Sequence, residues 1–283
     1  MDVIADIKII REILELSQKD FADKIGVSFE TVNRWENGKA KIGKGNIEAI
    51  YNFAYENEIY LNEIYEQIIK EEAKKKKRIL LFHGSKREIV FPLDLRFSKE
   101  HNDFGRGFYL GENFIQASTY ISNTTLGRVY AFSLEIDNLK IAKFNVTTEW
   151  MLAISYYRGW ISKYKNSEII KNIVDKVENS DIIIAPIADN RMFDLISEFT
   201  GGVITDEQCK HALAATNLGD QYVVRTANCL EKLRLEKEFY LSNKEKNTYI
   251  NKRLKDNKMN EDKVKVSRMK YRGKGLYIDE LLK

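Results

Sequence analysis

The chain contains only three histidines, and one of them, His83, stands where a side chain could do chemistry. It lies in LLFHGSK, at the end of an apolar run that is typical of a buried strand, and a glycine follows it. Histidine can donate, accept or transfer a proton near neutral pH, so it can act as an acid, a base or a hydrogen-bonding group. A lone histidine after an apolar strand is more often a core residue, so a functional interpretation needs partners elsewhere in the chain.

Two further segments supply such partners. Asp103–Tyr109 reads DFGRGFY, and Tyr120 follows at helical spacing in ENFIQASTY. Gly105 and Gly107 lack a Cβ, so the backbone of this loop could approach a ligand closely. The other segment, GDQYVVRT, has the pattern of an apolar strand with Gln221 near its start.

Taken together, the strand with H-G-S, the F-G-x-G-F-Y loop and the helix with Ala and Tyr resemble a known catalytic domain. It is that of the poly-ADP-ribose polymerases and diphtheria toxin, the histidine-tyrosine type of ADP-ribosyltransferase, which includes an uncharacterised bacterial branch. The resemblance covers roughly residues 78–235. It implies a split β-sandwich with helices, NAD as the donor of ADP-ribose, and no metal.

The resemblance also implies roles for individual residues. His83 would hydrogen-bond a ribose hydroxyl of NAD, and the backbone of Gly84 would bind the nicotinamide amide. Tyr109 would stack on the nicotinamide ring, with Tyr120 on its other side. Arg106 would pair with the pyrophosphate, unless it is merely an exposed loop cation. The predicted catalytic set is His83, Tyr109 and Gln221, and the predicted NAD-binding set is His83, Gly84, Ser85, Gly105, Arg106, Gly107, Tyr109 and Tyr120.

Two positions depart from the family pattern. Ala117 stands where the family often has a serine that bonds the nicotinamide, and Ser118 is one residue off. Gln221 stands where the family has a glutamate; it can still hydrogen-bond a ribose hydroxyl, but losing the charge typically costs on the order of 3 kcal/mol of transition-state stabilisation. Asp103 or Asp189 could supply the missing carboxylate. The sequence therefore predicts that Gln221→Glu keeps or raises the rate.

The N-terminal stretch LSQKDFADKIGVSFETVNRWENGK resembles the repressor/Cro-type helix-turn-helix. Gln18 would open the first helix of the motif, Ala22 would pack where the helices cross, and Gly26 would permit the turn. The predicted DNA contacts are Gln18, Ser28, Glu30, Thr31, Asn33 and Arg34. The alternative is a protein-interaction or dimerisation module that never contacts DNA.

The segment pattern predicts an α+β chain. Helical periodicity over residues 1–70 gives an all-α helix-turn-helix domain, and EEAKKKKR at 71–78 is interpreted as a basic linker. Strand-like runs at 79–85, 128–136, 181–188 and 221–226, separated by helical stretches, assign 79–235 to the ADP-ribosyltransferase domain. Residues 236–283 are predicted to form a basic, mostly helical extension whose apolar end, GLYIDELLK, docks on the domain.

Composition narrows the class of protein. A hydrophobic content of 43% is enough for packed cores, and the net charge of +4 says little about partners. Two cysteines form no disulfide framework or metal-ligand spacing, and no apolar run could span a bilayer. We therefore expect a cytoplasmic protein without membrane contact.

Three functions remain open at this stage. The first is an NAD-dependent mono-ADP-ribosyltransferase, a toxin or phage-defence effector that modifies nucleic acid or protein. The second is an NAD glycohydrolase, in which water is the acceptor. The third is a DNA-binding regulator that senses NAD or ADP-ribose without turnover. A second copy of the chain or an antitoxin is compatible with all three as a partner.

Overall fold

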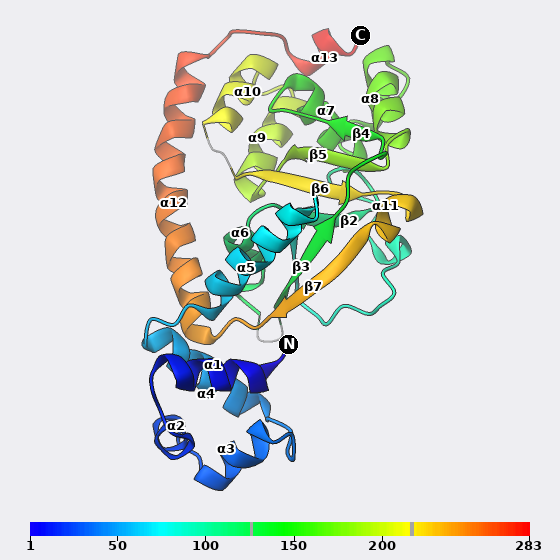
Figure 1. The fold of residues 1–283 in the computed structure, drawn as a ribbon. Coiled ribbons are helices and arrows are strands. Elements are labelled where there is room, and N and C mark those ends of the chain that lie inside the picture. Colours follow the sequence, from blue (N-terminus) through cyan, green and yellow to red (C-terminus); the bar gives the residue numbers. More distant parts are fainter. Residues whose placement is uncertain (125–126, 216–217) are drawn as a thin grey trace.

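The computed structural model describes residues 1–124, 127–215 and 218–283. A helical N-terminal unit is followed by a mixed sheet with helices, which confirms the α+β class (Figure 1). The N-terminal helices are α1 (Val3–Ile13), α2 (Gln18–Ile25), α3 (Phe29–Glu36), α4 (Lys44–Glu56) and α5 (Leu61–Lys75). The strands are β1 (Ile79–Ser85), β2 (Phe108–Gly111), β3 (Arg128–Leu134), β4 (Ile141–Lys143), β5 (Ile182–Pro186), β6 (Asp220–Val224) and β7 (Leu233–Phe239).

The remaining helices surround the sheet. They are α6 (Phe114–Ile121), α7 (Thr148–Tyr157), α8 (Glu168–Glu178), α9 (Asn190–Thr200), α10 (Asp206–Ala214), α11 (Ala227–Glu231), α12 (Asn243–Lys270) and α13 (Ile278–Leu281). Short 3-10 turns occur at Leu95–Phe97 and Ser162–Tyr164. The long helix α12 runs along one side of the sheet domain, from the helix-turn-helix end to the end where the C-terminus lies (Figure 1).

Local capping signals explain the helix-turn-helix. Ser17 accepts a hydrogen bond from the backbone N–H of Asp20 and forms a capping box with it at the start of α2. Gly26 ends α2 in the left-handed region at φ 73°, where a residue without Cβ is favoured. Ser28 then caps α3, and Ala22 is fully buried at the helix crossing. The predicted motif geometry is confirmed.

The strands form one seven-stranded sheet in the order β4-β5-β6-β2-β1-β3-β7, antiparallel except for β4 with β5. The β1–β3 pairing extends from Ile79 to Ser85, but β1 meets β2 through the single pair Phe82 and Gly111. The described strands therefore form one continuous sheet rather than two separate ones. The pairing between β1 and β2 is reduced to one residue pair, so the two strands diverge on either side of it. The candidate site lies at this junction.

The predicted boundary at residue 235 falls within β7, which continues to Phe239, so the first residues of the predicted helical extension belong to a strand. The segment LRLEKEF carries mostly charged residues because β7 is at the edge of the sheet. The prediction that the C-terminal end docks is confirmed. Ile278 and Leu282 are 1% and 4% exposed and belong to the same core as Trp150.

Residues 71–78 are not a linker with few contacts. Helix α5 continues through them to Lys75, and Ala73 is buried. Arg78 is 8% exposed: its Nε donates to Oγ of Ser133 at 2.8 Å, and its Nη2 donates to the carbonyl oxygens of Ser133 and Lys232. Because a buried guanidinium needs several acceptors, this arginine joins β1, β3 and the start of β7.

Candidate functional site

His83 lies at the end of β1, where β1 and β2 separate. Its Nδ1 is 2.7 Å from the carbonyl oxygen of Tyr109, and its ring stacks on Phe108 at a centroid distance of 4.6 Å. A carbonyl only accepts, so Nδ1 carries the hydrogen and Nε2 is left as an acceptor. Burial lowers the pKa of His83 below its ordinary value of 6.5, which keeps the imidazole neutral at neutral pH.

Tyr109 meets His83 through its backbone and not through its ring. Its hydroxyl donates to the carbonyl oxygen of Gly105 at 2.7 Å and accepts from the N–H of Phe104 at 3.1 Å. Successive side chains of a strand point to opposite faces, so the phenol lies on the face opposite Phe108 and the imidazole. In this structure the phenol holds the glycine loop, and burial raises its pKa.

The glycines are required by internal packing. A Cβ on Gly84 would lie 2.4 Å from the carbonyl oxygen of Ala117 in α6, and one on Gly107 would lie 2.5 Å from Cγ1 of Val223 in β6. Gly105 has φ +72°, in the left-handed region. Access of a ligand to the backbone, which the sequence suggested at Gly105 and Gly107, is therefore not the reason the structure gives for these glycines.

The other side chains predicted to bind NAD differ in their exposure and in whether they already have a partner within the protein. Tyr120 is 61% exposed at the end of α6, with the ammonium of Lys86 5.2 Å from its ring centre. Ser85 donates from Oγ to the carbonyl oxygen of Arg87 within a turn. Arg106 is bound by Glu100 at 2.5 Å and by the carbonyl oxygen of Arg96, so its charge is already partnered.

Ser118 does not replace the serine missing at Ala117. It is fully buried in α6, and its Oγ donates to the carbonyl oxygen of Phe114 one turn earlier. Gln116, on the same helix, has its Oε1 buried, and no residue in the described part of the chain donates to it. A Cβ built on Gly111 would lie 3.5 Å from that oxygen, so Gln116 reaches the β1–β2 junction.

Gln221 is joined to Asp103, which precedes the glycine loop. Its Nε2 lies 3.2 Å from Oδ2 of Asp103 and 3.1 Å from the carbonyl oxygen of Pro186. Both oxygens accept, so this orientation of the amide is the one its neighbours require. Arg158, at the end of α7, donates from Nε and Nη2 to Oδ1 of Asp103 at 2.9 and 2.7 Å. Its guanidinium also lies 3.6 Å from the ring centre of Phe193.

Of the two acids predicted as substitutes for the missing carboxylate, the structure brings only Asp103 to Gln221. Asp189 caps α9 by accepting from the N–H of Met192 and forms an ion pair with Arg191 at 2.9 Å. Sequence analysis missed Arg158, which is 55 residues from Asp103 and belongs to no recognisable motif. No spacing in the sequence could have joined these two residues.

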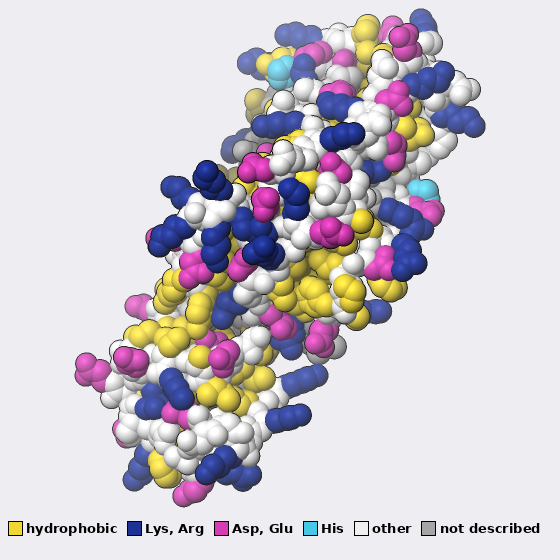
Figure 2. Space-filling view, turned by 45° about the vertical axis from the view of Figure 1, so that its right-hand side comes forward, with side chains coloured by type: hydrophobic (Ala, Val, Ile, Leu, Met, Phe, Trp, Pro, Cys, Tyr) yellow, Lys and Arg dark blue, Asp and Glu magenta, His cyan; other side chains and the backbone are white. Residues whose placement is uncertain are grey.

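In the helix-turn-helix, two side chains that were predicted to contact DNA, Asn33 and Gln18, are hydrogen-bonded to each other. Asn33 donates to Oε1 of Gln18, and Gln18 donates to Glu36, which Arg11 pairs at 2.6 Å. Ser28 serves as the cap of α3, with its Oγ beside Thr31. Ser28, Glu30 and Arg34 are the exposed members of the predicted set, and Ser28 is already used as a cap. Lys and Arg side chains also stand out at this lower end of the molecule in Figure 2.

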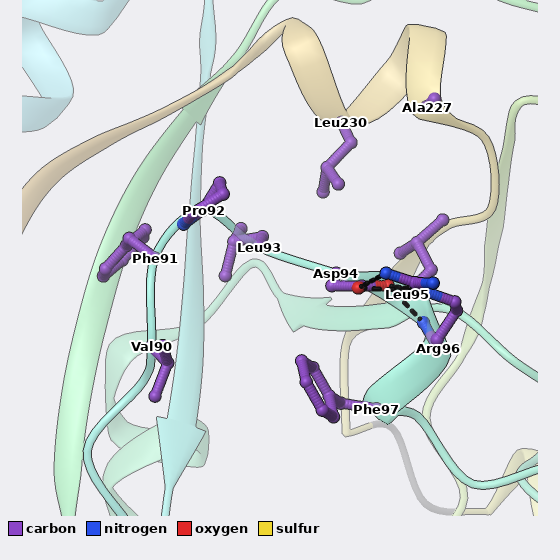
Figure 3. A pocket seen from close by; sticks show the side chains of 10 residues that line it. All are labelled: Val90, Phe91, Pro92, Leu93, Asp94, Leu95, Arg96, Phe97, Ala227 and Leu230. Atoms are coloured by element: carbon purple, nitrogen blue, oxygen red, sulfur yellow. Dashed lines mark hydrogen bonds and ion pairs between the residues drawn. The ribbon is translucent and has the colours of Figure 1, made fainter.

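A separate hollow of about 530 Å³ lies between the 90–97 loop and α11 (Figure 3). Its walls are mostly apolar, and none of the predicted site residues lines it. Val90 and Phe97 are 79% and 86% exposed at its rim. Its chemistry offers no charged or catalytic group besides the Asp94–Arg96 pair, so it is not the candidate site.

The described residues contain no group of three or more His, Cys, Asp or Glu that could hold a metal ion. In the same part of the chain, none of the helices combines the length and the apolar character needed to cross a bilayer.

Comparison with known proteins gives two matches to family models. Residues 7–52 match a model described as Helix-turn-helix, which confirms the N-terminal motif and suggests DNA binding. Residues 79–235, more than half of the chain, match a model described as Protein of unknown function (DUF3990). No curated protein and no solved structure matches. The chain therefore belongs to the DUF3990 family and carries a helix-turn-helix region in front of the family domain.

Proposed function

We propose that this chain is an NAD-dependent mono-ADP-ribosyltransferase with a DNA-binding N-terminal region. The observation that carries the proposal is the state of His83. Its Nδ1 is engaged by the carbonyl oxygen of Tyr109, and its Nε2 makes no hydrogen bond within the described residues. A neutral imidazole in this state offers one acceptor to a ligand hydroxyl, which is what a ribose of NAD requires.

Other groups near the junction, on the face of the sheet that carries the phenol of Tyr109, suit a ligand with hydroxyls and a flat ring. Oε1 of Gln221 makes no hydrogen bond within the described residues, which leaves it as a second acceptor. The exposed ring of Tyr120 can stack on a planar group. When bound, NAD would supply the ADP-ribosyl group, and nicotinamide would be released.

The test is incubation of the full chain with NAD labelled in its adenine moiety, with and without cell lysate. Label on a macromolecule supports transfer, free ADP-ribose indicates hydrolysis, and unchanged NAD would contradict the proposal. His83→Asn sharpens the test, because its amide keeps a donor for the carbonyl of Tyr109 but removes the Nε2 acceptor. We expect turnover to fall about 100-fold or more in this variant. His101→Asn, which changes an exposed histidine, should have no effect.

A further inference from the structure

We propose that Asp103 and Gln221 act as one unit, held by Arg158, in which Asp103 supplies the negative charge and Gln221 presents an oxygen to a hydroxyl of the donor. The inference rests on the proposed function and deepens it. It explains how a chain with an amide in place of the expected glutamate could still stabilise positive charge on a ribose. Asp103 and Arg158 are positioning residues in this proposal.

The polarity of the unit follows from its hydrogen bonds. The two protein groups nearest Nε2 of Gln221, at 3.2 and 3.1 Å, are a carboxylate oxygen of Asp103 and the carbonyl oxygen of Pro186. If the amide were flipped, Oε1 would face both acceptors and lose two hydrogen bonds. The NH2 group therefore faces Asp103 and Pro186, and Oε1 is left as an acceptor that makes no hydrogen bond within the described residues.

Arg158 fixes the position of the negatively charged carboxylate of Asp103. Two guanidinium nitrogens of Arg158 donate to Oδ1 of Asp103, and the arginine is itself stacked over Phe193. Asp103 is 8% exposed and Gln221 is 7% exposed, so little water screens the carboxylate from a ligand at Oε1. Asp103 thus acts on the ligand through the side-chain amide of Gln221. The carboxylate of Asp103 orients this amide, and the amide contacts the ligand.

This geometry reverses the expectation for Gln221→Glu. A glutamate would bring a carboxylate oxygen within about 3 Å of Oδ2 of Asp103 and of the Pro186 carbonyl, where no proton is available to join them. The expected result is a loss of activity, not a gain. In Asp103→Asn, the new NH2 would face that of Gln221, so the amide would flip and turn its donor side outward.

The decisive experiment is the double variant. Asn at 103 can keep its Oδ1 on Arg158 and donate from Nδ2 to a glutamate at 221, which restores a charged acceptor facing the ligand. Single-turnover release of nicotinamide at saturating NAD is measured for the wild type, Asp103→Asn, Gln221→Glu and Asp103→Asn/Gln221→Glu. We expect each single variant to fall on the order of 100-fold and the double variant to recover at least about tenfold over either.

Controls separate the possible failures. Asp94→Asn alters a half-buried carboxylate that pairs with Arg96 away from Gln221, and it should match the wild type. Thermal unfolding of each variant shows whether it is folded, and Arg158→Lys provides a milder disturbance of the same unit. An active wild type with an unaffected Asp103→Asn variant, or folded variants without rescue, would overturn the inference alone. A wild type that releases no nicotinamide would overturn the proposed function and this inference with it.

Discussion

Asn62 in α5 donates a hydrogen bond from Nδ2 to Oε2 of Glu245 in α12 over 2.8 Å, and the two residues are 183 positions apart. Tyr249 donates to the other carboxylate oxygen at 2.9 Å, and Glu245 is only 6% exposed. The N-terminal helices and the C-terminal helix thus meet at a buried carboxyl group. Burial, reinforced by the negative charge of Glu63, raises the pKa of Glu245 to about 7, although Asn62, Tyr249 and Lys246 act against the shift.

The first prediction is that this junction weakens as pH rises. Because the folded-state pKa lies above the ordinary value of 4.5, the folded protein holds a proton that the unfolded chain releases between these values. The stabilisation is present below about pH 4.5 and is lost as pH rises through about 7, an effect on the order of 3 kcal/mol. Glu245→Gln should flatten this dependence in urea unfolding and be more stable than the wild type at about pH 8. Glu71→Gln, which changes an exposed glutamate of the same helix α5, should follow the wild type; an unchanged slope in Glu245→Gln would exclude this group as its source.

The second prediction concerns the boundary after the helix-turn-helix. The sequence predicts that deletion of residues 1–70 leaves a folded domain. In the structure this cut removes Tyr65 and Ile69, which pack against the core around Phe82 and Phe114, and it removes Asn62 from the carbonyl oxygen of Tyr240. We expect this deletion to melt at least about 5 °C below a deletion of residues 1–57, which keeps α5. Equal melting temperatures in calorimetry would show that α5 contributes nothing to the sheet domain.

The third prediction tests the packing explanation for Gly84. Its added Cβ would lie 2.4 Å from a backbone oxygen of α6, which cannot move without shifting the helix. Gly84→Ala should therefore cost about 2 kcal/mol of unfolding free energy, even with no ligand present. Gly45, in α4, has nothing within 4 Å of a built Cβ, so Gly45→Ala should be neutral or slightly stabilising. Equal stability of the two variants would mean that Gly84 is needed by a ligand alone.

The fourth prediction distinguishes DNA contact from structure in the helix-turn-helix. Arg34→Ala removes an exposed cation from α3 and should weaken binding to duplex DNA while lowering the slope of log affinity against log salt by about one. Gln18→Ala should instead reduce stability, because Gln18 links Asn33 to Glu36. Titrations over a salt series, with unfolding curves beside them, separate these effects. DNA binding that is unaltered in Arg34→Ala would remove α3 as the contacting helix.

Helix ends, turns and strands could be predicted from the amino-acid sequence, because they depend mainly on residues that are neighbours in the chain. Gly26 was correctly assigned as the turn, and the caps Ser17 and Ser28 are local signals of the same kind, because each acts within one helical turn. The strands around His83 and Gln221 were also predicted, because a short apolar run bounded by polar segments is typical of a buried strand. The motifs that bring His83 to Tyr109 were visible in the chain as well, although the sequence predicted a ligand contact for the Tyr109 ring and the structure joins the two residues through the carbonyl oxygen of Tyr109.

The contacts between residues far apart in the sequence became visible in the three-dimensional structure alone. Arg158 reaches Asp103 across 55 residues, and Asp103 reaches Gln221 across 118, because β2 and β6 are paired and α7 ends beside the glycine loop. Arg78 was interpreted as the end of a basic linker, yet it is buried where two distant chain segments, at Ser133 and Lys232, bring carbonyl and hydroxyl oxygens together. Such partners are set by the path of the whole chain, and composition or periodicity around one residue carries no information about them.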